Sequence, residues 1–170
     1  DVYKAIGMDF SPNLSIYSQS VCPFFENDPL TLMDGDNVLN PGESANISIE
    51  LENEIGWVDA AQVTAILTTA NEHISIVDGN AVYGTIQNNG SETEVFEITV
   101  SDMIDLGDVV FNLLVTATGY DGYEYQTDLA FDIEVSLFQE GFPYDINAEV
   151  KGSQVVNDLD NDGDNEIIFG

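Results

Sequence analysis

The clearest pattern in the chain is a strict alternation of apolar and polar residues. Ala45, Ile47, Ile49 and Leu51 alternate with Ser44, Asn46, Ser48 and Glu50. Because successive side chains of a β-strand point to opposite faces, this spacing predicts a strand with one buried and one solvated face. Similar patterns predict strands over residues 13–18, 62–68, 74–77, 81–86, 94–100, 109–117 and 123–135. We find no convincing helical pattern.

The last two predicted strands form a long hairpin. Val109 to Ala117 alternate up to the turn Gly119-Tyr120-Asp121-Gly122, and the period continues to Val135. Strands of this length, separated by turns rich in Gly, Asn and Asp, are typical of two antiparallel sheets packed face to face. The sequence therefore predicts an all-β sandwich. Residues 22–32 are expected to be a proline-broken connection, with Cys22 as a small buried residue.

Residues 157–170 carry the most specific motif. Every second residue from Asp158 to Asp162 is an aspartate, and Gly163 follows them. Two more acidic residues and the apolar run 167–169 come after the glycine. Calcium takes six to eight oxygen ligands from a loop that curls round the ion, and a glycine allows the sharp turn. We therefore predict a Ca²⁺ loop leading into a strand, although a solvated acidic turn is the alternative. The predicted ligands are Asp158, Asp160, Asp162, Asp164 (through its carbonyl oxygen) and Glu166.

Two resemblances to known families rest on these residues. Residues 141–170, with Gly141-Phe142-Pro143 and the acidic loop, resemble the opening of an FG-GAP (VCBS-type) repeat, which implies one calcium loop. Residues 12–135 resemble the Ig-like (CARDB-like) modules of secreted bacterial proteins, on the segments 12–16, 34–43 and 77–86. The second resemblance implies an Ig-like antiparallel β-sandwich with a short C-terminal hairpin and calcium-loop extension.

These resemblances divide the chain into three parts. We expect an N-terminal arm or strand over residues 1–11, the Ig-like sandwich over residues 12–136, and a linker with a partial FG-GAP-like segment over residues 137–170. The chain begins at Asp1 without a signal peptide, so we expect a mature or excised piece of a longer protein.

The charge balance excludes several classes of partner. Two basic residues stand against 32 acidic ones, a net charge of −30. Nucleic acids and anionic membranes are recognised through Lys and Arg, so neither is expected as a partner, and no apolar run is long enough to span a membrane. The carboxylates of so acidic a chain repel one another, and this repulsion is relieved by salt or by bound cations. We therefore expect a secreted or cell-surface protein from a saline or calcium-rich setting.

A second acidic cluster precedes the strand at residue 44. Asp34, Asp36, Asn40 and Glu43 could hold a second Ca²⁺, or Asn40-Pro41-Gly42 could simply form a β-turn. The single histidine, His73, and the single cysteine give no spacing for zinc or for a nucleophilic triad.

Some loop residues suggest surface chemistry. Trp57 could close the end of the sandwich or, with Tyr120 and Tyr123, stack on a sugar. Asn13, Asn46 and Asn89 lie in Asn-x-Ser sequons and are candidate glycosylation sites.

The sequence thus favours a non-catalytic extracellular structural or adhesive module. It is expected to be stabilised by calcium and to be able to form homo-oligomers or filaments by strand addition. The alternatives are an accessory domain of a secreted hydrolase or protease, binding polysaccharide or acting as a spacer, and a glycosidase with a carboxylate pair.

Overall fold

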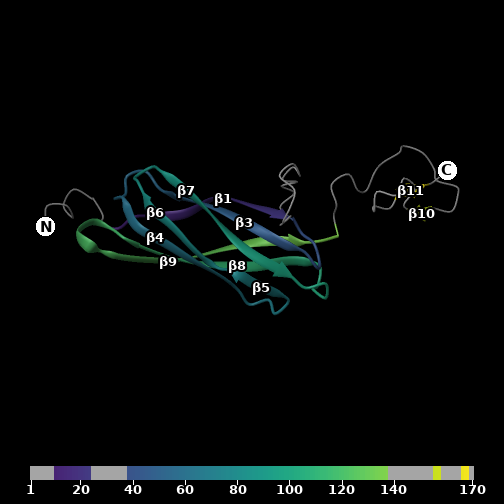
Figure 1. The fold of residues 1–170 in the computed structure, drawn as a ribbon. Coiled ribbons are helices and arrows are strands. Elements are labelled where there is room, and N and C mark those ends of the chain that lie inside the picture. Colours follow the sequence, from purple (N-terminus) through teal and green to yellow (C-terminus); the bar gives the residue numbers. More distant parts are fainter. Residues whose placement is uncertain (1–9, 24–37, 138–154, 158–165, 169–170) are drawn as a thin grey trace. The chain divides into compact units, whose positions relative to one another are not determined.

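In the computed structural model, residues 10–23, 38–137, 155–157 and 166–168 are described (Figure 1). The chain divides into two compact units, residues 1–140 and 141–170. Almost all regular structure in the described part is β-strand, with one short 3-10 turn at Tyr120–Gly122. The protein is an all-β, Ig-like antiparallel sandwich.

Nine strands build the two sheets of the first unit (Figure 1). The four-stranded sheet has the order β1-β3-β7-β5 and the five-stranded sheet the order β2-β9-β8-β4-β6. Their bounds are β1 Leu14–Pro23, β2 Val38–Leu39, β3 Ser44–Asn53, β4 Ala60–Thr69, β5 Ile74–Asp78, β6 Asn80–Ile86, β7 Ser91–Val100, β8 Gly107–Thr118 and β9 Glu124–Val135. β2 pairs with β9 in parallel, whereas the neighbouring strands in the rest of both sheets are antiparallel.

This strand order is that of an immunoglobulin-type sandwich. β1, β3, β7 and β5 occupy the places of strands A, B, E and D, and β4, β8 and β9 those of C, F and G. β6 extends the second sheet beside β4, the place that an additional strand takes in variable-type domains, but here it comes after β5 in the chain and does not directly follow β4.

The core lies between the inward faces of the two sheets. Every second residue of β3 from Ala45 to Leu51 is fully buried, as the alternation predicts. On the opposite sheet Phe111 and Phe131, paired across β8 and β9, stack with ring centroids 5.5 Å apart. The described core is apolar except for Asn53, at the end of β3.

One glycine lets the chain pass from one sheet to the other. β5 pairs with β7 and β6 pairs with β4, and only Gly79 separates the two strands. A Cβ atom at Gly79 would lie 2.6 Å from Cγ2 of Ile76 and 3.1 Å from the carbonyl oxygen of Leu67. The same close approach permits a 2.8 Å hydrogen bond from Leu67 N to Gly79 O. The crossing thus requires a residue without a side chain.

β1 and β9 run in the same direction along one side of the sandwich. The backbone N–H of Leu14 donates to the Tyr125 hydroxyl near the start of β9, and the Gln19 side chain donates to the Asp132 carbonyl near its end. The chain therefore enters the sandwich at one pole and leaves it at the other. The 12 residues of β9 span roughly 40 Å at about 3.3 Å per residue.

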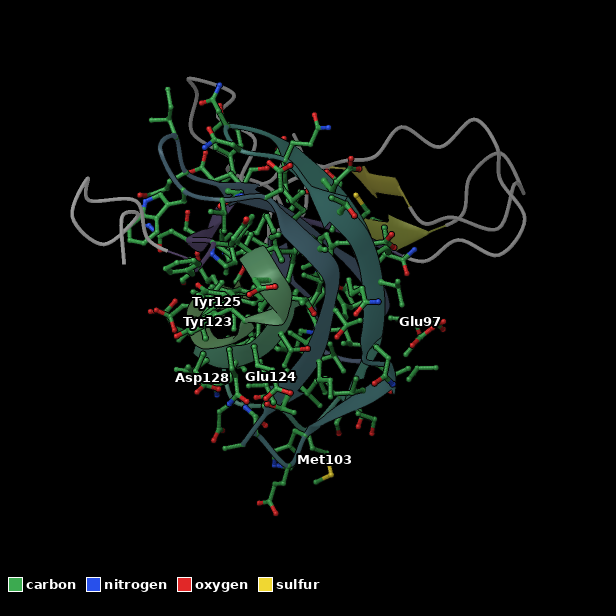
Figure 2. The ribbon with its side chains drawn as sticks, turned by 90° about the vertical axis from the view of Figure 1, so that its left-hand side faces the viewer. Glu97, Met103, Tyr123, Glu124, Tyr125 and Asp128 are labelled. Atoms are coloured by element: carbon green, nitrogen blue, oxygen red, sulfur yellow. The ribbon has the colours of Figure 1, made fainter. Side chains whose placement is uncertain are left out.

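Acidic side chains mark the outer faces of both sheets. Glu97 on β7 and Asp128 on β9 point away from the sandwich (Figure 2). On β9, which forms most of one edge of its sheet, the outward positions include Glu124, Asp128, Asp132 and Glu134. Charges on an edge strand oppose pairing with a foreign strand.

Three expectations about the N-terminal third are wrong. The strand expected over residues 13–18 runs on to Pro23, so Cys22 lies in β1 and not in a connection. Cys22 is half-buried, because it pairs with Asn46 on the solvated side of the sheet and does not enter the core. β2 lies where the sequence pattern predicts no strand, and it is two residues long.

The second unit contains a short antiparallel ribbon. β10 (Val155–Asn157) pairs with β11 (Glu166–Ile168), with Asn157 opposite Glu166. The strand predicted to follow the acidic loop is therefore confirmed. The loop itself, residues 158–165, lies outside the described residues.

Candidate functional site

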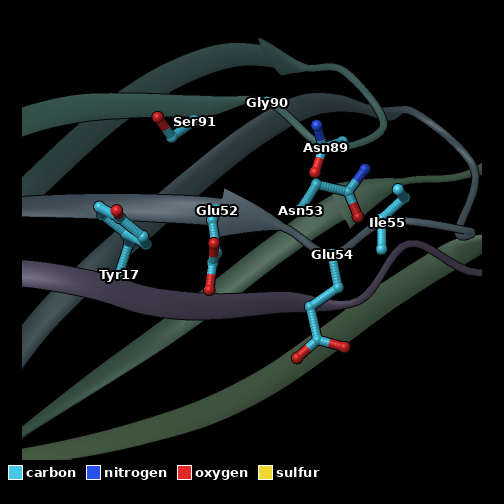
Figure 3. Close-up of a pocket in the computed structure, with 8 residues that line it drawn as sticks. All are labelled: Tyr17, Glu52, Asn53, Glu54, Ile55, Asn89, Gly90 and Ser91. Atoms are coloured by element: carbon cyan, nitrogen blue, oxygen red, sulfur yellow. The ribbon is translucent and has the colours of Figure 1, made fainter.

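A cleft of about 440 Å³ lies beside the end of β3 (Figure 3). Asn89 and Gly90 of the β6–β7 turn and Ser91 at the start of β7 line one side of it. Residues of β1, of β3 and of the β3–β4 loop line the other. Its lining combines carboxylate, amide and hydroxyl groups with two exposed apolar side chains. These residues are Tyr17, Glu52, Asn53, Glu54, Ile55, Asn89, Gly90 and Ser91.

A β-bulge places Tyr17 at this cleft. Ile16 pairs with Leu51 and Ser18 with Glu50, so Tyr17 is an extra residue with no partner in the register. Its side chain is 65% exposed, whereas Ile16 packs against the core. A bulge bends an edge strand and redirects a side chain, and it is often found next to a functional site. The bulge thus gives the outer face an aromatic ring that regular alternation does not predict.

Three glutamates follow one another on the outer face, and each accepts a hydrogen bond from a neighbouring segment. Glu52 accepts from the Ser15 hydroxyl at 3.3 Å, and Glu54 accepts from Nδ2 of Asn13 at 2.7 Å. Glu50 accepts from the hydroxyls of Ser91 (2.6 Å) and Ser18 (2.9 Å). The hydrogen bond from Ser91 lowers the pKa of Glu50 most, and the bond from Ser18 lowers it further, so this carboxylate stays ionised. The carboxylates are therefore held in place as hydrogen-bond acceptors.

Asn53 joins the segments that surround the cleft. Its side chain is 1% exposed, and its Oδ1 accepts from the backbone N–H of Asn13 at 3.1 Å. Its Nδ2 donates to the carbonyl oxygens of Val58 (2.8 Å) and Ile86 (3.3 Å). One buried amide thus ties together the approach to β1, the β3–β4 loop and the end of β6. The alternation of β3, carried one step beyond Leu51, places residue 53 inward, which is the signal that the sequence offers for this role.

The predicted metal ligands lie largely outside the described residues. This holds for Asp34, Asp36, Asp158, Asp160, Asp162 and Asp164, while Glu166 is described only as part of β11. Asn40 and Glu43 are described: the Glu43 N–H donates to the Asn40 carbonyl at 3.3 Å across Pro41 and Gly42, whose φ is +86°. The expected β-turn is therefore present. Among the described residues, no three His, Cys, Asp or Glu side chains are grouped to hold a metal.

The aromatic residues singled out in the sequence lie away from the cleft lining. Trp57 is half-buried, and its carbonyl oxygen accepts from Nδ2 of Asn88. Tyr120 is exposed and its ring lies 5.7 Å from that of Phe10, while Tyr123 is 51% exposed beside the β8–β9 turn. His73 is half-buried, in the turn before β5.

The three sequons lie in different settings. Asn46 lies on the outward side of β3, as predicted, and Asn89 is an exposed turn residue with φ +58°. Nδ2 of Asn13, the atom that a glycan would modify, donates to Glu54. Within the described part, no helix is long and apolar enough to cross a membrane.

Comparisons with known proteins return distant structural likenesses. No family model matches the sequence, and no curated protein matches it significantly. A CARDB domain from Pyrococcus furiosus, crystallised in complex with di-metal ions, is 14% identical over 76% of this chain and 91% of its own, with a TM-score of 0.40. A family 123 glycoside hydrolase from Clostridium perfringens is 16% identical over 71% of this chain and 27% of its own (TM-score 0.30). A β-glucosidase from Listeria innocua is 16% identical over 73% and 16% (TM-score 0.30). The strand order and the registers of the two sheets define the fold.

Proposed function

We propose that the chain is a non-catalytic structural module of an extracellular protein that works in salt or in calcium-rich surroundings. One observation carries the proposal: the chain enters the sandwich at Leu14 and leaves it at Val135, at opposite poles. A module of this kind can be placed in series with others, and each copy adds its own length to an extended protein.

The geometry also suits the transmission of force. Tension applied through the two ends would pull β1 and β9 along their own axes, in opposite directions. The hydrogen bonds of β1 to β3 and of β9 to β8 would then be loaded together and would not open one at a time. The outward carboxylates keep the module highly charged, and the salt of the surroundings screens their repulsion.

Single-molecule stretching tests this role. With handles at the two ends of the chain, the sandwich is expected to unfold in one event that lengthens the tether by about 400 Å. This value is the length of the fully extended chain from Leu14 to Val135 minus the distance between these two residues in the folded state. Stepwise peeling at low force, beginning with the ten residues of β1, would contradict the proposal.

Calcium is the second part of the proposal. The ribbon of β10 and β11 brings the two ends of the acidic loop together, which favours the closure of a loop around an ion. Binding to the folded state would stabilise it by linkage and offset part of the charge. We expect calorimetry to show one Ca²⁺ bound through Asp158, Asp160, Asp162, Asp164 and Glu166, and a variant with Asn at the first three positions to lose the heat. Equal heats from both proteins would refute this site, and Asp34 and Asp36 would then be the next to replace.

Assembly is the third part. Copies would associate through segments 1–10 and 148–170, added as strands to the edge of a neighbour's sheet. β1 is the more favourable acceptor, because the outward positions of β9 carry carboxylates while those of β1 carry hydroxyls such as Ser18 and Ser20. Light scattering of the full chain and of a chain lacking residues 148–170, both with calcium, tests this. Monomers in both samples at high concentration would exclude it.

A further inference from the structure

We propose that the Tyr17 cleft binds an uncharged polysaccharide, with the Tyr17 ring stacked on a sugar ring and Glu52 and Glu54 accepting hydrogen bonds from its hydroxyls. This goes beyond the role of a structural module and does not depend on it. The cleft is concave, the ring is 65% exposed, and the polar groups surround it. The ligand class follows from the chemistry of these groups.

A sugar ring has an apolar face of C–H groups and a rim of hydroxyls. Tyr17 offers a flat apolar face, and Ile55, which is 76% exposed, offers a second apolar contact at the other end of the cleft (Figure 3). Aromatic rings with a polar tip are common at binding surfaces because they combine contact area with a hydrogen bond. Tyr17 is thus suited to cover one face of a sugar while its hydroxyl stays solvated.

The hydrogen-bonding groups of the cleft are in position before a ligand arrives. An ionised carboxylate has about four acceptor sites. The bond from Ser15 to Glu52 and the bond from Asn13 to Glu54 fix each carboxylate and leave its other sites open for sugar hydroxyls. Asn89 adds an exposed side-chain amide on the opposite wall. Groups held in this way lose little conformational entropy on binding.

The charge of the chain decides against acidic polysaccharides. With a net charge of −30 and with Glu50, Glu52 and Glu54 along the face, an anionic polymer would be repelled. A basic peptide would be attracted, but it would be held by charge and would be released by salt. Binding of a neutral sugar relies on stacking and hydrogen bonds and is therefore insensitive to salt.

Affinity electrophoresis and calorimetry test the proposal with the full chain. The probes are xylan, mixed-linkage β-glucan and galactomannan as uncharged polysaccharides, alginate as an acidic one and polylysine as a basic polymer. We expect at least one uncharged probe to retard the protein, Tyr17→Ala to weaken its binding about tenfold or more, and Tyr17→Trp to retain it. The matched control is Tyr123→Ala, which removes another half-exposed tyrosine that is not part of the cleft lining.

Glu52→Gln separates the two ligand classes. Gln keeps the shape and an acceptor oxygen, so binding of a neutral sugar should weaken only about threefold and should be the same in low and high salt. Retardation that Tyr17→Ala abolishes and Tyr123→Ala leaves intact supports the proposal. It is overturned if no uncharged probe binds, if both tyrosine variants lose binding equally, or if only polylysine binds and Glu52→Gln or salt removes that binding.

Discussion

Replacing Asn53 should test how the cleft region is held together. Asn53→Ala removes three side-chain hydrogen bonds, to Asn13 N, Val58 O and Ile86 O, from a position that is 1% exposed. Each bond contributes about 0.5–1.5 kcal/mol net, and the buried Ile86 carbonyl would lose this partner. We therefore expect a loss of about 3 kcal/mol in the free energy of unfolding. For a domain of this size the melting temperature should fall by about 6–12 °C.

The assay is urea denaturation followed by tryptophan fluorescence, which reports on Trp57 in the loop that Asn53 holds. The midpoint should fall while the slope with urea stays constant, because unfolding exposes the same additional surface in the variant and in the wild type. The control is Asn112→Ala, on the exposed face of β8, which should change stability by less than about 0.5 kcal/mol. Equal effects of the two variants would refute the role assigned to Asn53.

Asn53→Asp adds a dependence on pH. The new carboxyl keeps the acceptor for the Asn13 N–H but replaces a donor with an oxygen that faces two carbonyls. Burial raises the pKa of such a carboxyl in the folded state, so stability is present at low pH and is lost as the pH rises through that value. The variant should therefore be less stable than Asn53→Ala at neutral pH and should recover toward pH of about 4. A cost independent of pH would show that the site admits water.

Three further predictions concern the sandwich as a whole. Gly79→Ala should destabilise the sandwich by about 1–3 kcal/mol because the new methyl group meets Cγ2 of Ile76. A double-mutant cycle tests this contact: Ile76→Ala should lower the free energy of unfolding less in the Gly79→Ala protein than in the wild type. Burial, and secondarily Glu94, raises the pKa of Tyr83, whose hydroxyl donates to the Ile49 carbonyl. A group whose pKa is raised in the folded state stabilises the fold at pH values below its unfolded-state pKa, so the contribution of Tyr83 is lost as the pH rises above about 10. Absorbance titration measures this. Wild type should show one more ionising tyrosine than Tyr83→Phe only when the chain unfolds. Finally, the melting temperature should rise between about 0.05 and 2 M sodium chloride as repulsion is screened, and a flat profile would show that the carboxylates do not repel one another appreciably.

The sequence predicts the strands well because burial and alternation coincide. Ala45 to Leu51 and Val109 to Val115 alternate cleanly and are buried as expected. It does not show that residues 74–86 belong to two sheets, because β5 and β6 have the same period on either side of Gly79. The crossing depends on a contact with Leu67, which comes from packing and not from local preference.

The candidate site was harder to predict than the fold. A bulge such as that at Tyr17 changes the register by one residue, and the surrounding residues Ile16 and Ser18 still look like a regular strand in the sequence. The sequence favours exposed rings on loops, such as Tyr120 and Tyr123, as candidates for sugar binding. It does not single out Asn53, because a polar residue at the end of an alternating run resembles the start of a loop.

The row of carboxylates on β9 gives salt two opposing effects on this protein. Repulsion keeps a second molecule away from the outward carboxylates of β9, which are Glu124, Asp128, Asp132 and Glu134. These charges therefore slow the pairing of the exposed strand with another molecule, although their mutual repulsion also lowers the stability of the fold. A high salt concentration stabilises the single folded molecule, but it also screens the repulsion between molecules, because the Debye length falls to about 3 Å at 1 M salt. Collisions between neighbours would then more often bring two edges into register. The solution lifetime of the folded monomer should therefore pass through a maximum at an intermediate salt concentration.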